Sequence, residues 1–199
     1  MKDNFQQRKK SLLEKEDKSS IGKWDLKVIE LCDKINSLDN YYTTSSCSGR
    51  IMTILDEDKK GPGLFQFVSH DLVELEDFVK ELPSSSLNPP PRSTASPTLG
   101  EINLKFKQEP FILHVACKKL DDAKVLMKKA HNVGWKRVGI ISLGKNIIVE
   151  INGNEKLDFP LVKEGKLLVS EAFLKEVLVK ANSNLEKGWG KVEKLRKEF

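Results

Sequence analysis

The chain has 199 residues, of which 39% are hydrophobic and 32% are charged, and its formal net charge is +5. This composition excludes a wholly disordered chain, and no apolar run reaches the ~18 residues of a membrane-spanning helix. The polar N-terminus argues against a secretory signal, and three cysteines without a CxxC pair argue against a disulfide framework or a zinc knuckle. We therefore expect a cytoplasmic protein with no membrane association and no metal site.

Helical and extended patterns alternate through the first part of the chain. In chain order, the spacing of apolar side chains predicts a charged helix at 5–16, a helix at 24–38, extended chain at 41–55, a strand at 64–70 and a helix at 71–82. Cys32 lies on the apolar face of the second helix and is interpreted as a core residue. Ser48-Gly49 is expected to bend or bulge the extended segment. The alternate aromatics Phe65 and Phe67 resemble a base-stacking strand, but core packing is the interpretation we favour.

A proline-rich stretch separates the two parts of the chain. Five of the eight prolines lie between Pro83 and Pro97, interleaved with Ser, Thr and Asn. Such a stretch forms neither a helix nor a central strand. We interpret residues 83–98 as a loop within one domain that spans residues 1–199, because neither flank has the size of a comfortable independent domain.

The second part repeats the mixture of strands and helices. The pattern predicts strands at 102–106, 111–117, 138–143, 147–151 and 156–161, a helix at 120–133, and a C-terminal helical segment at 170–199. Gly134 is expected to end the first of these helices, and Ser170 to cap the second. Gly188 and Gly190 are expected to break or kink the last helix, and Cys117 is assigned to the core.

The links between predicted strands are short, which favours antiparallel pairing over the long crossovers of a parallel sheet. Each half of the sequence contains several predicted strands and a packed helix, although the amino-acid sequence shows no internal repeat. The predicted fold class is therefore α+β, with a mostly antiparallel sheet, packed helices and two similar halves.

Positive charge gathers in two places. Residues 118–137 contain seven basic and two acidic side chains, and the tail after Gly188 contains four basic and two acidic ones. The plainest interpretation is solvated helix faces. The alternative is an interface for nucleic acid, where Lys and Arg neutralise phosphates without reading sequence.

A short run of polar residues at the predicted bend is the first candidate for chemistry. The run Ser45-Ser46-Cys47-Ser48-Gly49-Arg50 combines hydroxyls, a thiol, a glycine that allows close backbone approach, and a guanidinium suited to a phosphate or carboxylate. A polar edge strand with a bulge would explain the same run of residues equally well.

Two histidines are the other candidates. His70 closes a predicted strand, where loops meet the end of a sheet, so it is a candidate acid, base or orienting group. His114 lies within an apolar strand, where a histidine satisfied inside the core is the competing interpretation. His131, on a helix, is expected to be exposed. Because GxSxG, Walker A, HExxH and GxGxxG motifs are all missing, the residues by themselves lead to a basic α+β domain with a polar pocket and RNA as a candidate ligand.

Four stretches carry a more specific signal. They are residues 34–51 with the SSCSGR run, Phe67–Asp71, Glu109–Val115, and residues 130–141 with Gly134-Trp135-Lys136. Together they resemble the tRNA wybutosine-synthesis N4-methyltransferase family, and the resemblance extends over residues 24–185.

The resemblance implies a methyltransferase with a non-Rossmann fold. It implies transfer of a methyl group from S-adenosylmethionine to N4 of a tricyclic guanosine derivative beside the anticodon of phenylalanine tRNA, with the anticodon stem-loop as partner. On this reading the substrate-binding residues are Ser45, Ser46, Ser48 and Arg50, and the catalytic candidates are His70 and His114, either of which could remove a proton.

Two alternatives stay open. One is a non-catalytic RNA-binding module of the same family, and the other is an interaction protein whose basic faces are only solvated. Binding of the methyl donor distinguishes the enzyme from both, and salt-dependent tRNA binding distinguishes the two alternatives from each other.

Overall fold

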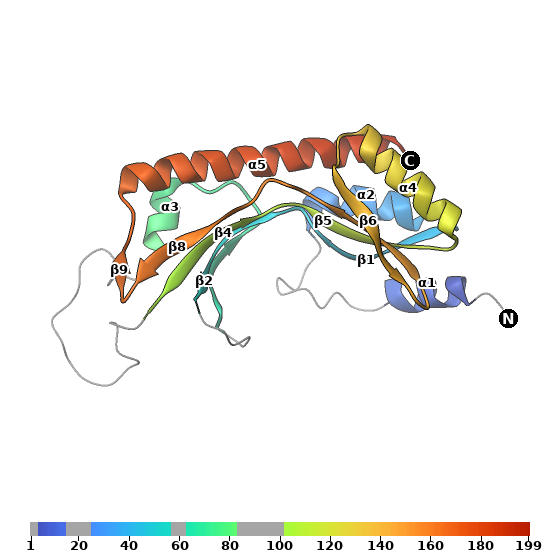
Figure 1. Ribbon diagram of the computed structural model, residues 1–199, viewed down its shortest axis with the longest axis horizontal. Coiled ribbons are helices and arrows are strands. Elements are labelled where there is room, and N and C mark those ends of the chain that lie inside the picture. Colours follow the sequence, from blue (N-terminus) through green and yellow to red (C-terminus); the bar gives the residue numbers. More distant parts are fainter. Residues whose placement is uncertain (1–3, 15–24, 57–62, 83–101) are drawn as a thin grey trace. The chain divides into compact units, whose positions relative to one another are not determined.

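The computed structural model of the protein describes residues 4–14, 25–56, 63–82 and 102–199 (Figure 1). It divides the chain into two compact units, which we describe separately. Unit 1 comprises residues 1–48, 110–154 and 187–199, and unit 2 comprises residues 49–109 and 155–186. Each unit draws on both halves of the sequence. The expectation of one domain stays a prediction, and the predicted loop at 83–98 lies outside the described residues.

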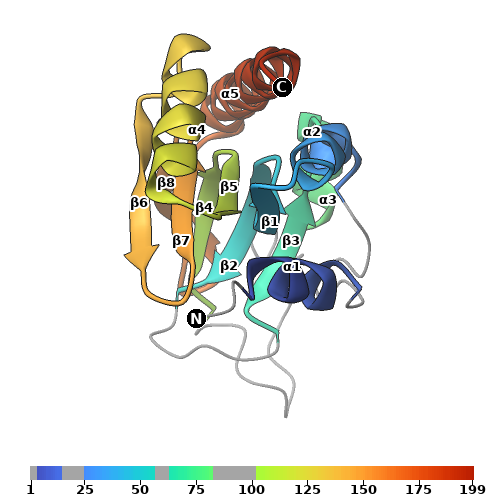
Figure 2. The ribbon, with the colours of Figure 1, turned by 90° about the vertical axis from the view of Figure 1, so that its right-hand side faces the viewer.

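Unit 1 is built on a four-stranded antiparallel sheet with helices on both faces. The strand order is β1 (Tyr41–Cys47), β5 (Ile112–Cys117), β7 (Ile147–Asn152) and β6 (Arg137–Leu143). The helices are α1 (Phe5–Leu13), α2 (Leu26–Asn36) and α4 (Leu120–Asn132). Figure 2 shows α2 and α4 on one side of these strands and α1 on the other.

The core of unit 1 lies between the sheet and the helices α2 and α4. Alternate strand residues such as Leu113 and Val149 meet the apolar stripes of both helices, which include Cys32 and Leu126. Trp135 is 1% exposed and stacks on Phe111, with ring centroids 4.7 Å apart. The two stacked rings are among the largest fully buried side chains of the protein.

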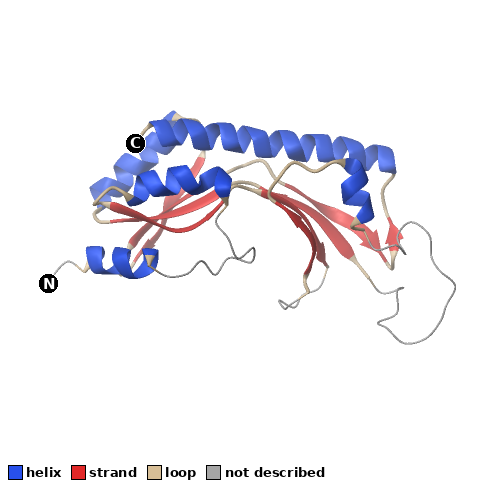
Figure 3. Cartoon of the chain, turned by 180° about the vertical axis from the view of Figure 1, so that it is seen from behind, coloured by secondary structure: helices blue, strands red, loops and turns tan. Residues whose placement is uncertain are grey.

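Unit 2 contains a five-stranded antiparallel sheet. The strand order is β3 (Phe65–Ser69), β2 (Arg50–Leu55), β4 (Leu104–Glu109), β8 (Leu157–Lys163) and β9 (Lys166–Leu167). Helix α3 (Leu75–Lys80) and the residues of α5 (Glu171–Lys197) up to Glu186 cover one face of it (Figure 3). Phe78 and Phe106 are fully buried in its core, and ring contacts continue from them through Phe67 and Phe159 to the half-exposed Phe173.

The α+β class and the antiparallel pairing are confirmed. Every paired strand in both sheets is antiparallel, but the pairs β1–β5 and β2–β4 join strands far apart in the sequence and are not hairpins. Gly134 ends α4 with a φ of 94°, and Ser170 Oγ accepts a hydrogen bond from the Phe173 N–H at the start of α5, as predicted. None of the helices within the described ranges combines the length and hydropathy needed to cross a bilayer.

Three details of the prediction are wrong. Gly188 and Gly190 do not break α5, which continues to Lys197 because burial of Leu185 and Val192 offsets the cost of about 1 kcal/mol for each helical glycine. Phe65 is 45% exposed and lies 5.5 Å from the Arg50 guanidinium instead of in the core. The strand β9 was not predicted, because two residues are too few to show a strand pattern.

Two buried thiols are expected to make the protein less stable at alkaline pH. Burial raises the pKa of Cys32 from 9.0 to about 11 and the pKa of Cys117 to about 12. The unfolded chain therefore loses these protons first, so it binds fewer protons than the folded chain above pH 9. We expect the free energy of unfolding to fall as pH rises from 9 through 11, by up to about 1.4 kcal/mol per pH unit for each thiol.

Urea unfolding in a reducing buffer between about pH 8 and about pH 11 measures this slope. Burial also raises the pKa of Tyr41, to about 12, so part of the slope above pH 10 belongs to this phenol. The control is the double variant Cys32→Ala/Cys117→Ala, in which the thiol contribution is absent. An equal slope for the double variant and the parent protein would contradict the assignment to the thiols.

Candidate functional site

A row of three polar side chains crosses three neighbouring strands of unit 1. Ser45 Oγ on β1 lies 2.8 Å from His114 Nδ1 on β5. His114 Nε2 lies 2.8 Å from Glu150 Oε2 on β7. We call these three residues the polar row. Both nitrogens of the imidazole are thereby engaged, which fixes the orientation of the ring.

The strand register explains why these residues meet. His114 is paired with Ser45 on one side and with Glu150 on the other, and Glu150 is paired in turn with Gly139 on β6. A bulge between Thr43 and Ser45 shifts β1 by one residue, so that Ser45 faces the histidine. A Cβ at Gly139 would meet no atom within 4 Å, so the space beside Glu150 is open.

The polar row is accessible to a ligand. The side chains of His114 and Glu150 are 25% and 29% exposed, and Ser45 is exposed. The Glu150 carboxylate accepts a hydrogen bond from Nε2–H, which leaves Nδ1 as the acceptor for the Ser45 hydroxyl. This arrangement resembles in chemistry the hydroxyl–imidazole–carboxylate series that moves protons in hydrolases.

The other two serines of the SSCSGR run point elsewhere. Ser46 is paired with Leu113, a residue of the helix-covered face, and its hydroxyl acts to lower the pKa of the Cys32 thiol against the larger effect of burial. Ser48 is 1% exposed, and its carbonyl accepts a hydrogen bond of 3.2 Å from Trp189 Nε1. The three serines therefore do not form a single polar surface.

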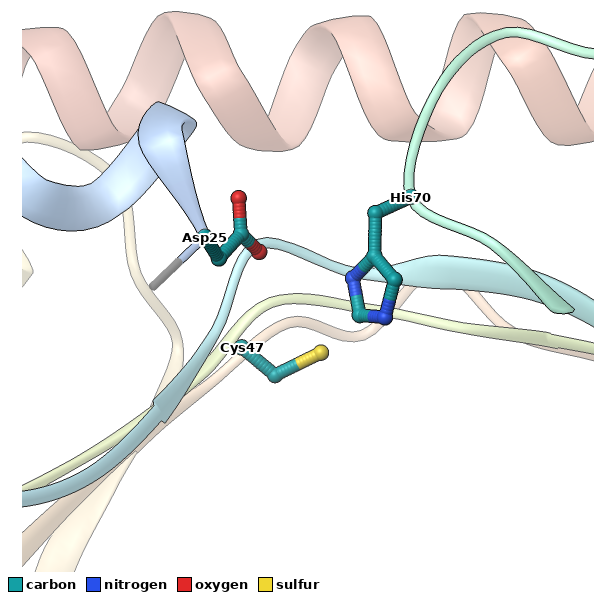
Figure 4. A group of neighbouring side chains, drawn as sticks. All are labelled: Asp25, Cys47 and His70. Carbon is teal, nitrogen blue, oxygen red and sulfur yellow. The ribbon is translucent and has the colours of Figure 1, made fainter. Parts of the chain in front are cut away.

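Asp25 connects α2 to the end of β1. As the N-cap of the helix it accepts from Lys27 N–H at 3.2 Å, and its second oxygen accepts from Ser48 N–H at 2.8 Å. Figure 4 shows Asp25 and Cys47 side by side, with a carboxylate oxygen and the Sγ atom within 4.8 Å of each other. The aspartate thus anchors the backbone that follows the polar row.

Arg50 and His70 belong to unit 2. The Arg50 guanidinium donates to Glu109 Oε2, from Nη2 at 2.7 Å and from Nε at 2.8 Å. Ile51 is paired with Ser69, so Arg50 and His70 occupy adjacent positions at the ends of β2 and β3. The guanidinium expected to hold a ligand anion therefore already holds a carboxylate of its own unit.

Two residues of unit 1 were not among those predicted from the sequence. Glu150 is a charged residue in the apolar strand Ile147–Ile151, which is a signal for a functional group on the outer face. Asp25 precedes the apolar pattern of α2 in the manner of an N-cap, which is a signal for structure only. Neither signal says which residues the two carboxylates contact.

The predicted basic stretch is partly neutralised within unit 1. Lys124 pairs with Asp121 at 3.0 Å, and Lys129 donates to the carbonyl of Glu198. Asp122 caps α4 by accepting from Lys119 N–H at 2.9 Å. Lys128 and Lys136 are exposed, as is His131, as predicted.

Known proteins match this chain over almost its whole length. The model of the family described as "Methyltransferase TYW3" matches residues 6–199. The "tRNA(Phe) 7-((3-amino-3-carboxypropyl)-4-demethylwyosine(37)-N(4))-methyltransferase" of Archaeoglobus fulgidus is 38% identical over 177 residues, which is 87% of this chain and 82% of that one. The "tRNA wybutosine-synthesizing protein 3 homolog" of Homo sapiens is 32% identical over 198 residues, which is 96% of this chain and 70% of that one.

A solved structure has the same fold. The PH1069 protein of Pyrococcus horikoshii superposes with a TM-score of 0.79 at 31% sequence identity. The match covers 98% of this chain and 93% of that protein. The predicted non-Rossmann architecture is thereby confirmed.

Proposed function

Because the chain belongs to the TYW3 methyltransferase family, we propose that it transfers a methyl group from S-adenosylmethionine to N4 of a demethylwyosine-type nucleoside at position 37 of phenylalanine tRNA. The proposal places the protein in the cytoplasm with its tRNA. The polar row is the observation that supports a site for this reaction, because it joins a hydroxyl, an imidazole and a carboxylate in hydrogen-bond contact.

The reaction needs a group that accepts the proton of the methylated nitrogen. In our proposal the bond between N4 and the methyl carbon forms as the bond between sulfur and that carbon breaks, and the sulfur keeps the electron pair. The N4 proton passes to Ser45 Oγ while the Ser45 hydroxyl proton passes to His114 Nδ1. The resulting imidazolium faces Glu150, whose carboxylate stabilises it.

The polar row also fits a cationic methyl donor. Glu150 presents a partly exposed carboxylate, which attracts a positive sulfonium, and Gly139 leaves the space next to it open. When bound, the donor supplies an electrophilic methyl group. Holding donor and acceptor in line is the larger part of the task of such an enzyme.

The remaining candidates keep different roles in the proposal. Ser46 and Ser48 support the strand that presents Ser45, since one faces Cys32 and the other is buried. Arg50 and His70 stay predictions for substrate binding and catalysis within unit 2. The exposed basic residues of α4, such as Lys128, lie across the sheet from α1, so their contact with the backbone of the anticodon stem stays a prediction from the sequence.

The test uses the purified full chain with labelled S-adenosylmethionine and phenylalanine tRNA from cells that lack this protein. After digestion to nucleosides, the expected result is label in the tricyclic guanosine. A matched phenylalanine tRNA without the tricyclic base is the control and should take up no label. Label elsewhere, or none, would contradict the proposed reaction. Absence of label together with tRNA binding but no donor binding would instead support a non-catalytic RNA-binding module.

A further inference from the structure

A pocket lies next to the polar row, between α1 and the sheet of unit 1. Its volume is about 420 Å³. Helix α1 lines it with Gln7, Arg8, Ser11 and Leu12, and the sheet side lines it with Tyr42, Thr44 and Asn146. We call it the α1 pocket. Its volume falls within the range of about 300–1,000 Å³ that is usual for small-ligand sites.

The walls of the α1 pocket are held in place by specific contacts. The Phe5 ring packs on Tyr42 with centroids 5.0 Å apart, and Lys9 Nζ donates to the Leu38 carbonyl at 2.6 Å. Arg8 Nε donates to Asn146 Oδ1 at 2.7 Å, which ties α1 to the turn between β6 and β7. The pocket is thus a built feature of unit 1, with its helix attached through Phe5, Arg8 and Lys9.

The chemistry of the α1 pocket favours an anion with polar edges. Arg8 is its single charged residue, and the seven lining residues include no acid. The described part of the chain gives Arg8 no carboxylate partner, whereas Arg50 and Arg196 both have one. The terminal amino groups of Arg8 therefore suit a phosphate, while the amides and hydroxyls of its neighbours suit a ribose or the edge of a base.

The α1 pocket is directly connected to the polar row. Thr44 lines the pocket, its Oγ1 donates to the His114 carbonyl at 3.4 Å, and the next residue is Ser45. A nucleotide in the pocket would therefore neighbour a base that reaches Ser45. We propose that the α1 pocket binds one nucleotide of the single-stranded loop adjacent to the methylated one, with its phosphate on Arg8. This inference rests on the proposed function.

The same chemistry argues against the methyl donor as occupant. The donor carries a sulfonium, an ammonium and one carboxylate group. Arg8 suits the carboxylate, but the α1 pocket has no carboxylate to balance either of the two cationic groups. Loop nucleotides, in contrast, are recognised singly once they leave the stack, at a lower cost than bases in a duplex.

The first test compares Arg8→Ala with Lys10→Ala. Both variants remove one positive charge from α1, but Lys10 is exposed, pairs with Glu14 at 3.8 Å and does not line the pocket. Titration of unmodified phenylalanine tRNA by fluorescence anisotropy at several salt concentrations should show about tenfold weaker binding for Arg8→Ala, with a salt slope reduced by about 1. Lys10→Ala should bind as the parent protein does.

The second variant, Ser11→Trp, fills the pocket from an exposed position of α1 and keeps the Arg8–Asn146 contact. It should also weaken tRNA binding, and far-UV circular dichroism and thermal unfolding establish that each variant folds. Donor binding, measured by calorimetry with S-adenosylmethionine alone, should not change in any of the three variants.

The outcomes separate this inference from the proposed function. Unchanged tRNA binding in both Arg8→Ala and Ser11→Trp would overturn the inference, and so would a loss of donor binding with tRNA binding intact. If the parent protein transfers no methyl group, the proposed reaction is wrong. The tRNA titrations then still decide whether the α1 pocket binds a nucleotide.

Discussion

His114→Ala is expected to lower the rate of methyl transfer at saturating substrates by a factor of about 10²–10⁴, the contribution usual for a positioned general base. The imidazole is the central member of the polar row, in contact with Ser45 at 2.8 Å and Glu150 at 2.8 Å. Its removal leaves the proton of the methylated nitrogen without a path away from Ser45. Single-turnover transfer of labelled methyl, with donor and tRNA both in excess of their dissociation constants, measures the effect.

The dissociation constants for donor and tRNA should stay nearly unchanged, because the role of His114 is in the reaction step. His131→Ala is the matched control, since His131 is an exposed histidine of the same unit whose Nδ1 contacts the Trp135 carbonyl at 2.9 Å. Ser45→Ala should reduce the rate in the same way as His114→Ala, because the proton passes through its hydroxyl. Full activity of Ser45→Ala beside an inactive His114→Ala would contradict the relay.

The polar row also shows which residues of the candidate site could be predicted from the sequence and which could not. The serine and the histidine were recognisable as polar residues in otherwise apolar or extended segments, and the resemblance implied both as candidate site residues. Glu150 was missed because its contact depends on the pairing of β5 with β7, and strand register between distant segments is not encoded in any local pattern. The sequence alone does not distinguish the adjacent serines Ser45 and Ser46, but their side chains lie on opposite faces of the sheet.

The elements themselves were largely predictable. Helical spacing identified α2 and α4, and Gly134 ended α4 because glycine readily adopts a φ of 94°. Arg50 illustrates the remaining limit. A guanidinium after a glycine suggests an anion site, but its partner Glu109 comes from β4, which lies opposite β2 only once the sheet has formed.

Trp135→Ala is expected to lower the free energy of unfolding by about 3–5 kcal/mol, the range for removal of a fully buried aromatic side chain. Trp135 is 1% exposed, and its loss leaves Phe111 facing a cavity. Trp135→Phe should cost much less, because the smaller ring keeps the stack. It also removes an indole N–H that is buried without a hydrogen-bond partner among the residues the structure describes. Urea unfolding of the three proteins under identical conditions gives both differences.

The Phe111–Trp135 stack also connects the core of unit 1 to the polar row. Phe111 precedes β5, which carries His114, and Trp135 precedes β6, which carries Gly139. The Phe111–Trp135 stack therefore holds the starts of two of the four strands that form the surface around the row. Trp135→Phe should keep the parent rate of methyl transfer, because the strands keep their register when the stack survives. If Trp135→Phe destabilises the protein as much as Trp135→Ala does, the indole N–H has a role that the packing argument omits.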